Sequence, residues 1–178
     1  KDNNIGLPTH HSINIAVQNN NVEVLNWIKN NTNLEITQYH ANTAAGYGYI
    51  NLLEWLKENN LGVPNNYGAN YAAQADNLHI LEWMKENNLG LPNENGIINA
   101  VARGYLDILE WACENAIEFS KESIADVAAS RGHIHILEWM KENSLELPDQ
   151  EGAKSAATYG HVISLKWMKE NCKNISWN

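Results

Sequence analysis

The sequence predicts an all-α solenoid built from six 28-residue helix–turn–helix repeats, and two observations carry this prediction. First, the seven residues 53–59 (Leu-Glu-Trp-Leu-Lys-Glu-Asn) return with small changes at 81–87 and 137–143. Second, tryptophan recurs with a constant spacing, at Trp27, Trp55, Trp83, Trp111, Trp139 and Trp167. A fixed period between about 20 and 50 residues is typical of repeat proteins, whose units bury their apolar faces by stacking on their neighbours.

The repeats are predicted at 8–35, 36–63, 64–91, 92–119, 120–147 and 148–175, with Trp at position 20 of each. Residues 1–7 match the end of a preceding repeat and residues 176–178 match the start of a further one. We therefore expect 1–178 to be a single array that forms a segment of a longer one. All four prolines stand at position 1, just before the expected first helix. Position 2 then carries an N-cap residue in five repeats: Thr9, Thr37, Asn65, Asn93 and Asp149.

The first helix of each repeat is predicted to be lined with small residues. Position 9 is Ala in all six repeats, and position 10 is Ala or Val. With positions 6 and 13 they form one stripe of a helix, which allows a close approach to neighbouring helices. Position 13 is Gly in four repeats and Asn20 or Asp76 in the other two, so the helix is expected to turn there with positive φ.

The second helix is predicted at positions 15–23, with Leu at position 18 and Trp at position 20 on a wide apolar arc. This arc favours core packing of the tryptophans over a stacking platform for bases or sugars. Glu and Lys occupy the opposite, solvated arc. Asn at position 24 is expected to be the left-handed residue after the helix. The connection to the next repeat, about seven residues long, is too short for another helix.

Composition bounds the possible partners and the compartment. The formal net charge is −9, and the chain has no run of basic residues. We therefore expect neither a nucleic-acid partner nor an anionic membrane surface, because both require a cationic face. No apolar stretch approaches the ~20 residues of a membrane span. Cys113 and Cys172 lie two repeats apart, too far for a disulfide, which fits a cytoplasmic location.

The pattern Ala-Ala-x-x-Gly-His/Tyr-Leu/Ile resembles the ankyrin repeat, most clearly at 128–134 and 156–162. The chain is similar to the divergent, Trp-containing ankyrin arrays abundant in giant viruses, amoebae and microbes that live in amoebae. That likeness implies a protein-binding module without catalytic residues, located in the host cytoplasm if the source is a virus or an intracellular microbe. Two features depart from the family. The Thr-Pro-Leu-His motif is absent, and the 28-residue unit is shorter than the usual 33, so the β-hairpin finger is expected to be reduced to a turn.

Catalytic and metal chemistry find little support in the sequence. His133, His135 and His161 could suggest a metal site. However, residues i and i+2 point to opposite sides of a helix, and equivalent positions in adjacent repeats are about 10 Å apart. No nucleophile–base arrangement or phosphate-binding loop is present. We expect no enzyme activity, no cofactor and no metal.

The outward face of the first helix varies most between repeats and is therefore the candidate partner-binding face. Tyr and Arg are enriched in binding hot spots. The candidate residues lie at positions 4, 8 and 12: Tyr39, Tyr47, Tyr67, Tyr71, Arg103, Arg131 and Tyr159. The alternative interpretation is ordinary surface tyrosine covering Ala-lined grooves.

We expect a scaffold that binds a protein of unknown identity on its concave first-helix face. The alternative is a structural spacer, or a self-associating solenoid that positions another domain. A monomer is expected, and end-to-end association is possible through uncapped terminal repeats.

Overall fold

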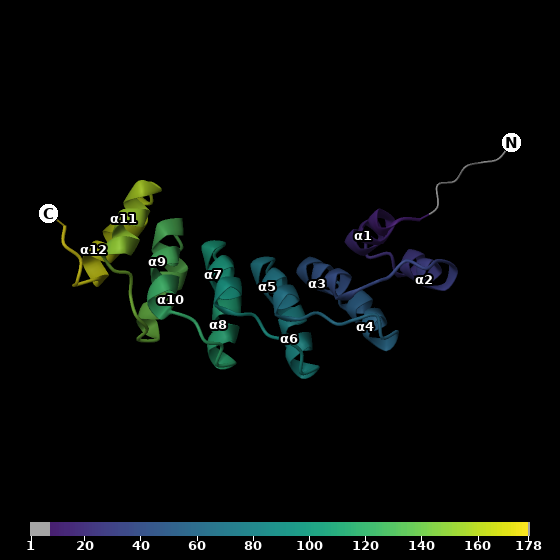
Figure 1. Cartoon of the computed structure of the whole chain (residues 1–178). Coiled ribbons are helices and arrows are strands. Elements are labelled where there is room, and N and C mark those ends of the chain that lie inside the picture. Colours follow the sequence, from purple (N-terminus) through teal and green to yellow (C-terminus); the bar gives the residue numbers. More distant parts are fainter. Residues whose placement is uncertain (1–7, 178) are drawn as a thin grey trace. The chain divides into compact units, whose positions relative to one another are not determined.

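A computed structural model describes residues 8–177, and over that range it contains twelve α-helices and no strand. The prediction of an all-α repeat fold is therefore confirmed, including the reduction of the inter-repeat connection to a turn (Figure 1). The chain divides into two compact units, Lys1–Leu91 and Pro92–Asn178. The division falls between the third and fourth predicted repeats. Residues 1–7 and 178, which the sequence assigns to flanking repeats, lie outside the described residues.

Unit 1 contains three helix pairs, one for each predicted repeat. The first helices are α1 (His10–Gln18), α3 (Gln38–Tyr47) and α5 (Asn66–Gln74). The second helices are α2 (Val22–Asn31), α4 (Ile50–Glu58) and α6 (Leu78–Glu86). The first helices form one layer and the second helices form the other (Figure 1).

Unit 2 repeats this arrangement. Its first helices are α7 (Glu94–Ala102), α9 (Lys121–Arg131) and α11 (Gln150–Thr158). Its second helices are α8 (Leu106–Glu114), α10 (Ile134–Glu142) and α12 (Val162–Asn171). Each helix lies close to the positions that the repeat period predicts.

Small side chains hold the first helices together. All six alanines at position 9 are buried, and α3 packs extensively on α5, as α9 does on α11. At Gly46 an added Cβ would lie 2.9 Å from the Cβ of Tyr71, so α5 could not approach α3 so closely if a side chain stood there. The predicted close packing of small residues is thus confirmed.

The helix starts follow the predicted N-caps with one shift. Asn65, Asn93 and Asp149 accept backbone N–H groups of the first turn through their side chains, and Thr9 and Thr37 form capping boxes. In the fifth repeat, where Lys121 stands at position 2, the cap moves back by one residue. There the hydroxyl of Ser120 accepts the N–H of Ser123.

The helix ends match the prediction in the first helix and differ in the second. All six residues at position 13 have positive φ, including Asn20 (51°) and Asp76 (62°). The prediction for Asn at position 24 is wrong, because Asn59 and Asn87 have φ of −91° and −90°. In four repeats the left-handed residue comes one position later, at Asn60, Asn88, Ala116 and Ser144. Each position-24 side chain instead donates its amide to the carbonyl oxygen of the tryptophan four residues earlier.

The tryptophan ladder is only partly buried. Trp83, Trp111 and Trp167 are 7% exposed and belong to the core, as predicted. Trp55 and Trp139 are half-buried. For Trp27 the prediction of core packing is wrong, since 52% of it is exposed. Trp167 contacts the second helix of the preceding repeat, where its indole N–H donates to Glu138. No described repeat precedes Trp27.

Side-chain hydrogen bonds to backbone carbonyls join successive repeats. The hydroxyl of Tyr49 donates to the carbonyl of Gln18 at 3.0 Å, and the amide of Asn77 donates to the carbonyl of Gly46 at 2.8 Å. His133 makes the equivalent contact with the carbonyl of Ala102 at 3.1 Å. These bonds fix the register of one repeat on the next within each unit.

Candidate binding surface on the first helices

The structure exposes all seven candidate residues and divides them between the two units. Tyr39 and Tyr47 lie on α3, and Tyr67 and Tyr71 lie on α5, all in unit 1. Arg103, Arg131 and Tyr159 stand at the ends of α7, α9 and α11 in unit 2. The candidates therefore form two separate groups, one in each unit.

The unit 1 group contains four tyrosines, whereas the unit 2 group contains one. Tyr39 and Tyr67 occupy the same position in successive repeats and are each 63% exposed. Tyr71, one turn beyond Tyr67, is 50% exposed, and Tyr47 is 49% exposed. We call these four residues the tyrosine face.

Neighbouring contacts hold part of the tyrosine face in place. The ring of Tyr47 stacks on that of Tyr49, with centroids 5.6 Å apart and planes 11° apart. Tyr49 is anchored in turn by its hydroxyl on the carbonyl of Gln18. The Cβ of Tyr71 is seated over Gly46. Tyrosine rings that are held in this way lose little conformational entropy on binding a partner.

The first-helix layer of unit 1 also lacks charge. Helices α1, α3 and α5 contain no Asp, Glu, Lys or Arg residue. The second helices of unit 1, in contrast, carry Glu23, Lys29, Glu54, Lys57, Glu58, Glu82, Lys85 and Glu86. The first helices of unit 2 are charged as well, since α9 alone contains Lys121, Glu122, Asp126 and Arg131. This segregation of charge can be read from the sequence once the repeats are aligned.

In unit 2 the candidate residues form one pair. The guanidinium of Arg131 lies over the ring of Tyr159, 5.4 Å from its centroid, which is within the range of a cation–π interaction. Arg103 is exposed at the end of α7. The unit 2 candidates therefore offer one exposed aromatic ring, Tyr159, whereas the tyrosine face offers four.

The histidines serve as structural hydrogen-bonding groups. Besides the bond from His133, the imidazoles of His79 and His135 lie 3.1 and 2.9 Å from the carbonyls of Gly48 and Gly104. The expectation that His133 and His135 point to opposite sides is wrong, since their ring centroids are 5.7 Å apart. The reason is that His133 is the N-cap of α10 and stands outside the helical turn. Among residues 8–177, no three His, Cys, Asp or Glu side chains gather as metal ligands do.

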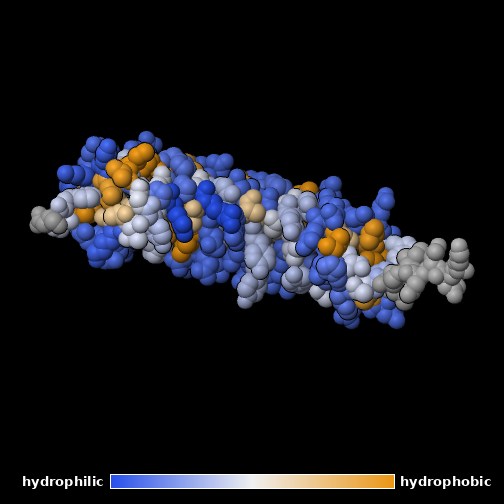
Figure 2. Space-filling model, turned by 90° about the horizontal axis from the view of Figure 1, so that it is seen from above, coloured by the Kyte–Doolittle hydropathy of each residue, from blue (hydrophilic) through white to orange (hydrophobic). Residues whose placement is uncertain are grey.

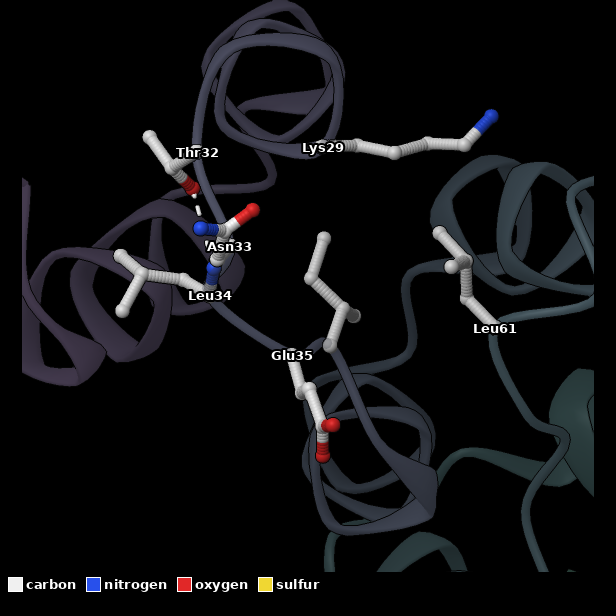
Figure 3. Close-up of a pocket in the computed structure, with 7 residues that line it drawn as sticks. Lys29, Thr32, Asn33, Leu34, Glu35 and Leu61 are labelled. Atoms are coloured by element: carbon white, nitrogen blue, oxygen red, sulfur yellow. Dashed lines mark hydrogen bonds between the residues drawn. The ribbon is translucent and has the colours of Figure 1, made fainter.

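One surface depression lies beneath the connection between α2 and α3 (Figure 3). It has a volume of about 350 Å³ and is lined in part by Leu34, Ile36 and Leu61. Two of its polar groups already have partners within the fold. The hydroxyl of Thr32 accepts the N–H of Leu34, and the ammonium of Lys29 donates to Asn59. The Glu35 carboxylate points away from the pocket centre. The depression is therefore part of the inter-repeat turn.

A second depression, of about 530 Å³, lies between α4 and α6 on the second-helix side. Three acidic residues (Glu54, Glu58 and Glu86) line it together with Trp83. Lys57 lies among them with its ammonium on the side-chain oxygen of Asn87. Mixed, exposed charges of this kind form a solvated surface.

The described part of the chain contains no helix that is long and apolar enough to cross a membrane. On the face that Figure 2 shows, most of the surface is polar and the hydrophobic residues form separate patches.

Comparisons with known proteins identify the fold class alone. No protein-family model and no curated protein matches the sequence. The structure is similar to the pentatricopeptide repeat protein PPR10 from maize, with a TM-score of 0.51 and 13% identity over 97% of this chain. Two structures of PPR10 in complex with an 18-nt psaJ RNA element align with TM-scores of 0.45 and 10% identity over 91% of this chain. The chain spans 28–31% of the length of these proteins.

These structures correct the expectation about nucleic acid. The exclusion of a nucleic-acid partner is contradicted, because PPR10, a helical-repeat protein, is bound to RNA in two of them. The physical reason is that net charge sums over the whole chain, whereas a strand contacts one face. Helices α1, α3 and α5 carry no acidic residue that would repel a phosphate. The fold that the comparisons support is a helical-repeat solenoid.

Proposed function

We propose that this chain is a protein-binding scaffold whose partner contacts the tyrosine face of unit 1. The observation that carries the proposal is that four tyrosines, each about half exposed or more, lie on helices without Asp, Glu, Lys or Arg residues. Tyrosine contributes a large contact area with few rotatable bonds, and it is enriched in binding hot spots. Because α1, α3 and α5 carry no Asp, Glu, Lys or Arg residue, a partner meets aromatic area and hydrogen-bonding groups on this layer.

Within unit 1 the layer of first helices forms the inner, concave side, because small residues let these helices approach more closely than the second helices. A partner on that side contacts several repeats at once. The role is binding without catalysis, and the repeats are of a short ankyrin-like type. The two free thiols, Cys113 and Cys172, are consistent with a cytoplasmic location.

The experiment is a selection of random peptides displayed on phage, using the full chain as bait. Selected peptides are then measured on Tyr67→Ala/Tyr71→Ala and on a matched control, Asn95→Ala/Asn99→Ala. The control changes the same two repeat positions on α7, where both asparagines are exposed. The tyrosine double variant should lose at least about tenfold in affinity while its helicity and Tm stay unchanged, and the control should bind like the wild type.

Two outcomes would refute the proposal. Peptides that bind the tyrosine double variant as well as the wild type would place the site elsewhere. Binding of a short single-stranded RNA that weakens steeply between about 50 and about 500 mM NaCl, while no peptide is selected, would replace the protein partner with a nucleic acid.

A further inference from the structure

A row of aromatic rings crosses the first-helix layer of unit 1 at one repeat position. Position 4 is His11 on α1, Tyr39 on α3 and Tyr67 on α5, and all three side chains are exposed. These helices lie side by side in one layer, where α1 packs on α3 and α3 packs on α5 (Figure 1). In unit 2 the same position carries Asn95, Ser123 and Glu151, so the row is confined to unit 1.

The spacing of this row is set by helix packing. Helices that pack through small residues have axes about 8–10 Å apart. Equivalent side chains on α1, α3 and α5 therefore follow one another at about that interval. If a bound peptide presents the same type of side chain to each ring, its side chains must also recur at that interval.

Among regular backbone conformations, the polyproline II helix has this period. It has three residues per turn and a rise of about 3.1 Å, so every third side chain lies on one edge about 9.3 Å from the next. In a β-strand, side chains on one face recur about every 6.6–6.8 Å and would lose register over three helices. An α-helical partner requires an apolar groove, whereas the only large exposed aliphatic side chain on α1, α3 and α5 is Ile15.

The chemistry of the face agrees with that geometry. A polyproline II segment makes no internal hydrogen bonds, so its carbonyl groups are free to accept them. The tyrosine face offers phenol hydroxyls as donors, and Asn66, which precedes Tyr67 on α5, is also exposed. With no charge on these helices, an uncharged segment gains the most, because a charged side chain would lose hydration there without meeting a counter-ion.

We propose that the tyrosine face of unit 1, together with His11, binds an uncharged proline-rich segment in the polyproline II conformation. The segment runs across α1, α3 and α5 and places a proline ring against His11, Tyr39 and Tyr67 at every third residue. Such a segment is already extended before binding, so little ordering entropy is lost. The inference rests on the proposed function and names the class of partner for the same site.

The test is fluorescence polarisation with a labelled, end-capped peptide of about ten residues made of alanine and proline, with proline at every third position. A second peptide of the same composition carries its prolines consecutively. The periodic peptide should bind the full chain at least about tenfold more tightly. The double variant Tyr39→Ser/Tyr67→Ser should bind the periodic peptide at least about tenfold more weakly than the wild type. The control variant Asn95→Ala/Ser123→Ala should bind it with unchanged affinity. Affinity should vary less than about twofold between about 50 and about 500 mM NaCl.

The outcomes separate this inference from the proposed function. Equal affinity for the two peptides, or no binding of either, would overturn the polyproline II assignment. If the phage selection still yields peptides that depend on Tyr67 and Tyr71, the protein-binding role stands and only the partner class falls. Circular dichroism of the serine variant tests folding, which should be unaffected because each tyrosine is 63% exposed.

Discussion

At the scale of single residues, Asp126 stands at a repeat position where Asn42 makes the same hydrogen bond with a neutral amide. Its carboxylate accepts the N–H of Asp149 at 3.1 Å, as Asn42 accepts the N–H of Asn65 at 3.0 Å in unit 1. Burial, together with the nearby carboxylates of Asp149 and Glu122, raises the pKa of Asp126 to about 6. An Asn side chain can make the same hydrogen bond without ionising.

We therefore expect Asp126→Asn to remove a pH dependence of stability. Between about pH 6 and pH 4 the folded carboxyl takes up a proton while the unfolded one stays ionised. The free energy of unfolding of the wild type, relative to the variant, should thus rise as pH falls through that window. The change should be about 1 kcal/mol after allowance for solvent screening. Urea titrations of both proteins at several pH values measure it, and parallel pH profiles would contradict the assignment.

Ser164 is a second residue that departs from its repeat position. Its hydroxyl is buried without a hydrogen-bond partner, whereas the equivalent residues Leu52, Ile80, Ile108 and Ile136 are buried aliphatics. Ser164→Ile removes an unsatisfied polar group and adds apolar contact. Unfolding in urea should show a gain of about 1–2 kcal/mol. A loss of stability would mean that the site is too small for the larger side chain.

At the scale of the helical element, the turn after each first helix depends on space as well as on φ. Gly132 and Gly160 have nearly the same φ, 79° and 77°. A Cβ at Gly132 would lie 2.7 Å from Nδ1 of His161 in the next repeat, but one at Gly160 would meet nothing within 4 Å. Gly160→Ala should cost about 1 kcal/mol for the left-handed backbone alone. Gly132→Ala should cost about 1 kcal/mol more, because the imidazole must also move. Equal thermal shifts in the two variants would show that His161 moves aside freely.

The second helices allow the burial of tryptophan to be tested within one chain. Trp83→Ala should lower the free energy of unfolding by about 3–5 kcal/mol, because Trp83 is 7% exposed. Trp27→Ala, at the same repeat position but 52% exposed, should cost less than about 1–2 kcal/mol. Denaturant titration compares them directly. A small effect at Trp83 would contradict its core assignment.

The repeat period predicted the helices and their packing well, because propensity, capping and small-residue spacing all repeat together. Its errors are local. The side chain of Asn at position 24 bonds back to the preceding turn, and in four repeats the left-handed residue is the one that follows it. The sequence also predicted the exposed positions of the first helix. It could not predict the division at Leu91–Pro92, since that junction resembles those at 63–64 and 147–148.

At the scale of the whole molecule, we expect a destabilising substitution in one unit to increase unfolding in that unit and not in the other. In a solenoid each repeat contacts only its neighbours, so stability is nearly a sum of repeat and interface contributions. Hydrogen exchange followed by mass spectrometry resolves this, since it reports opening helix by helix. Trp83→Ala should accelerate exchange in α3 to α6 and leave α9 to α12 unchanged. Trp167→Ala should do the reverse. Equal acceleration across all these helices would show that residues 8–177 unfold as one cooperative body.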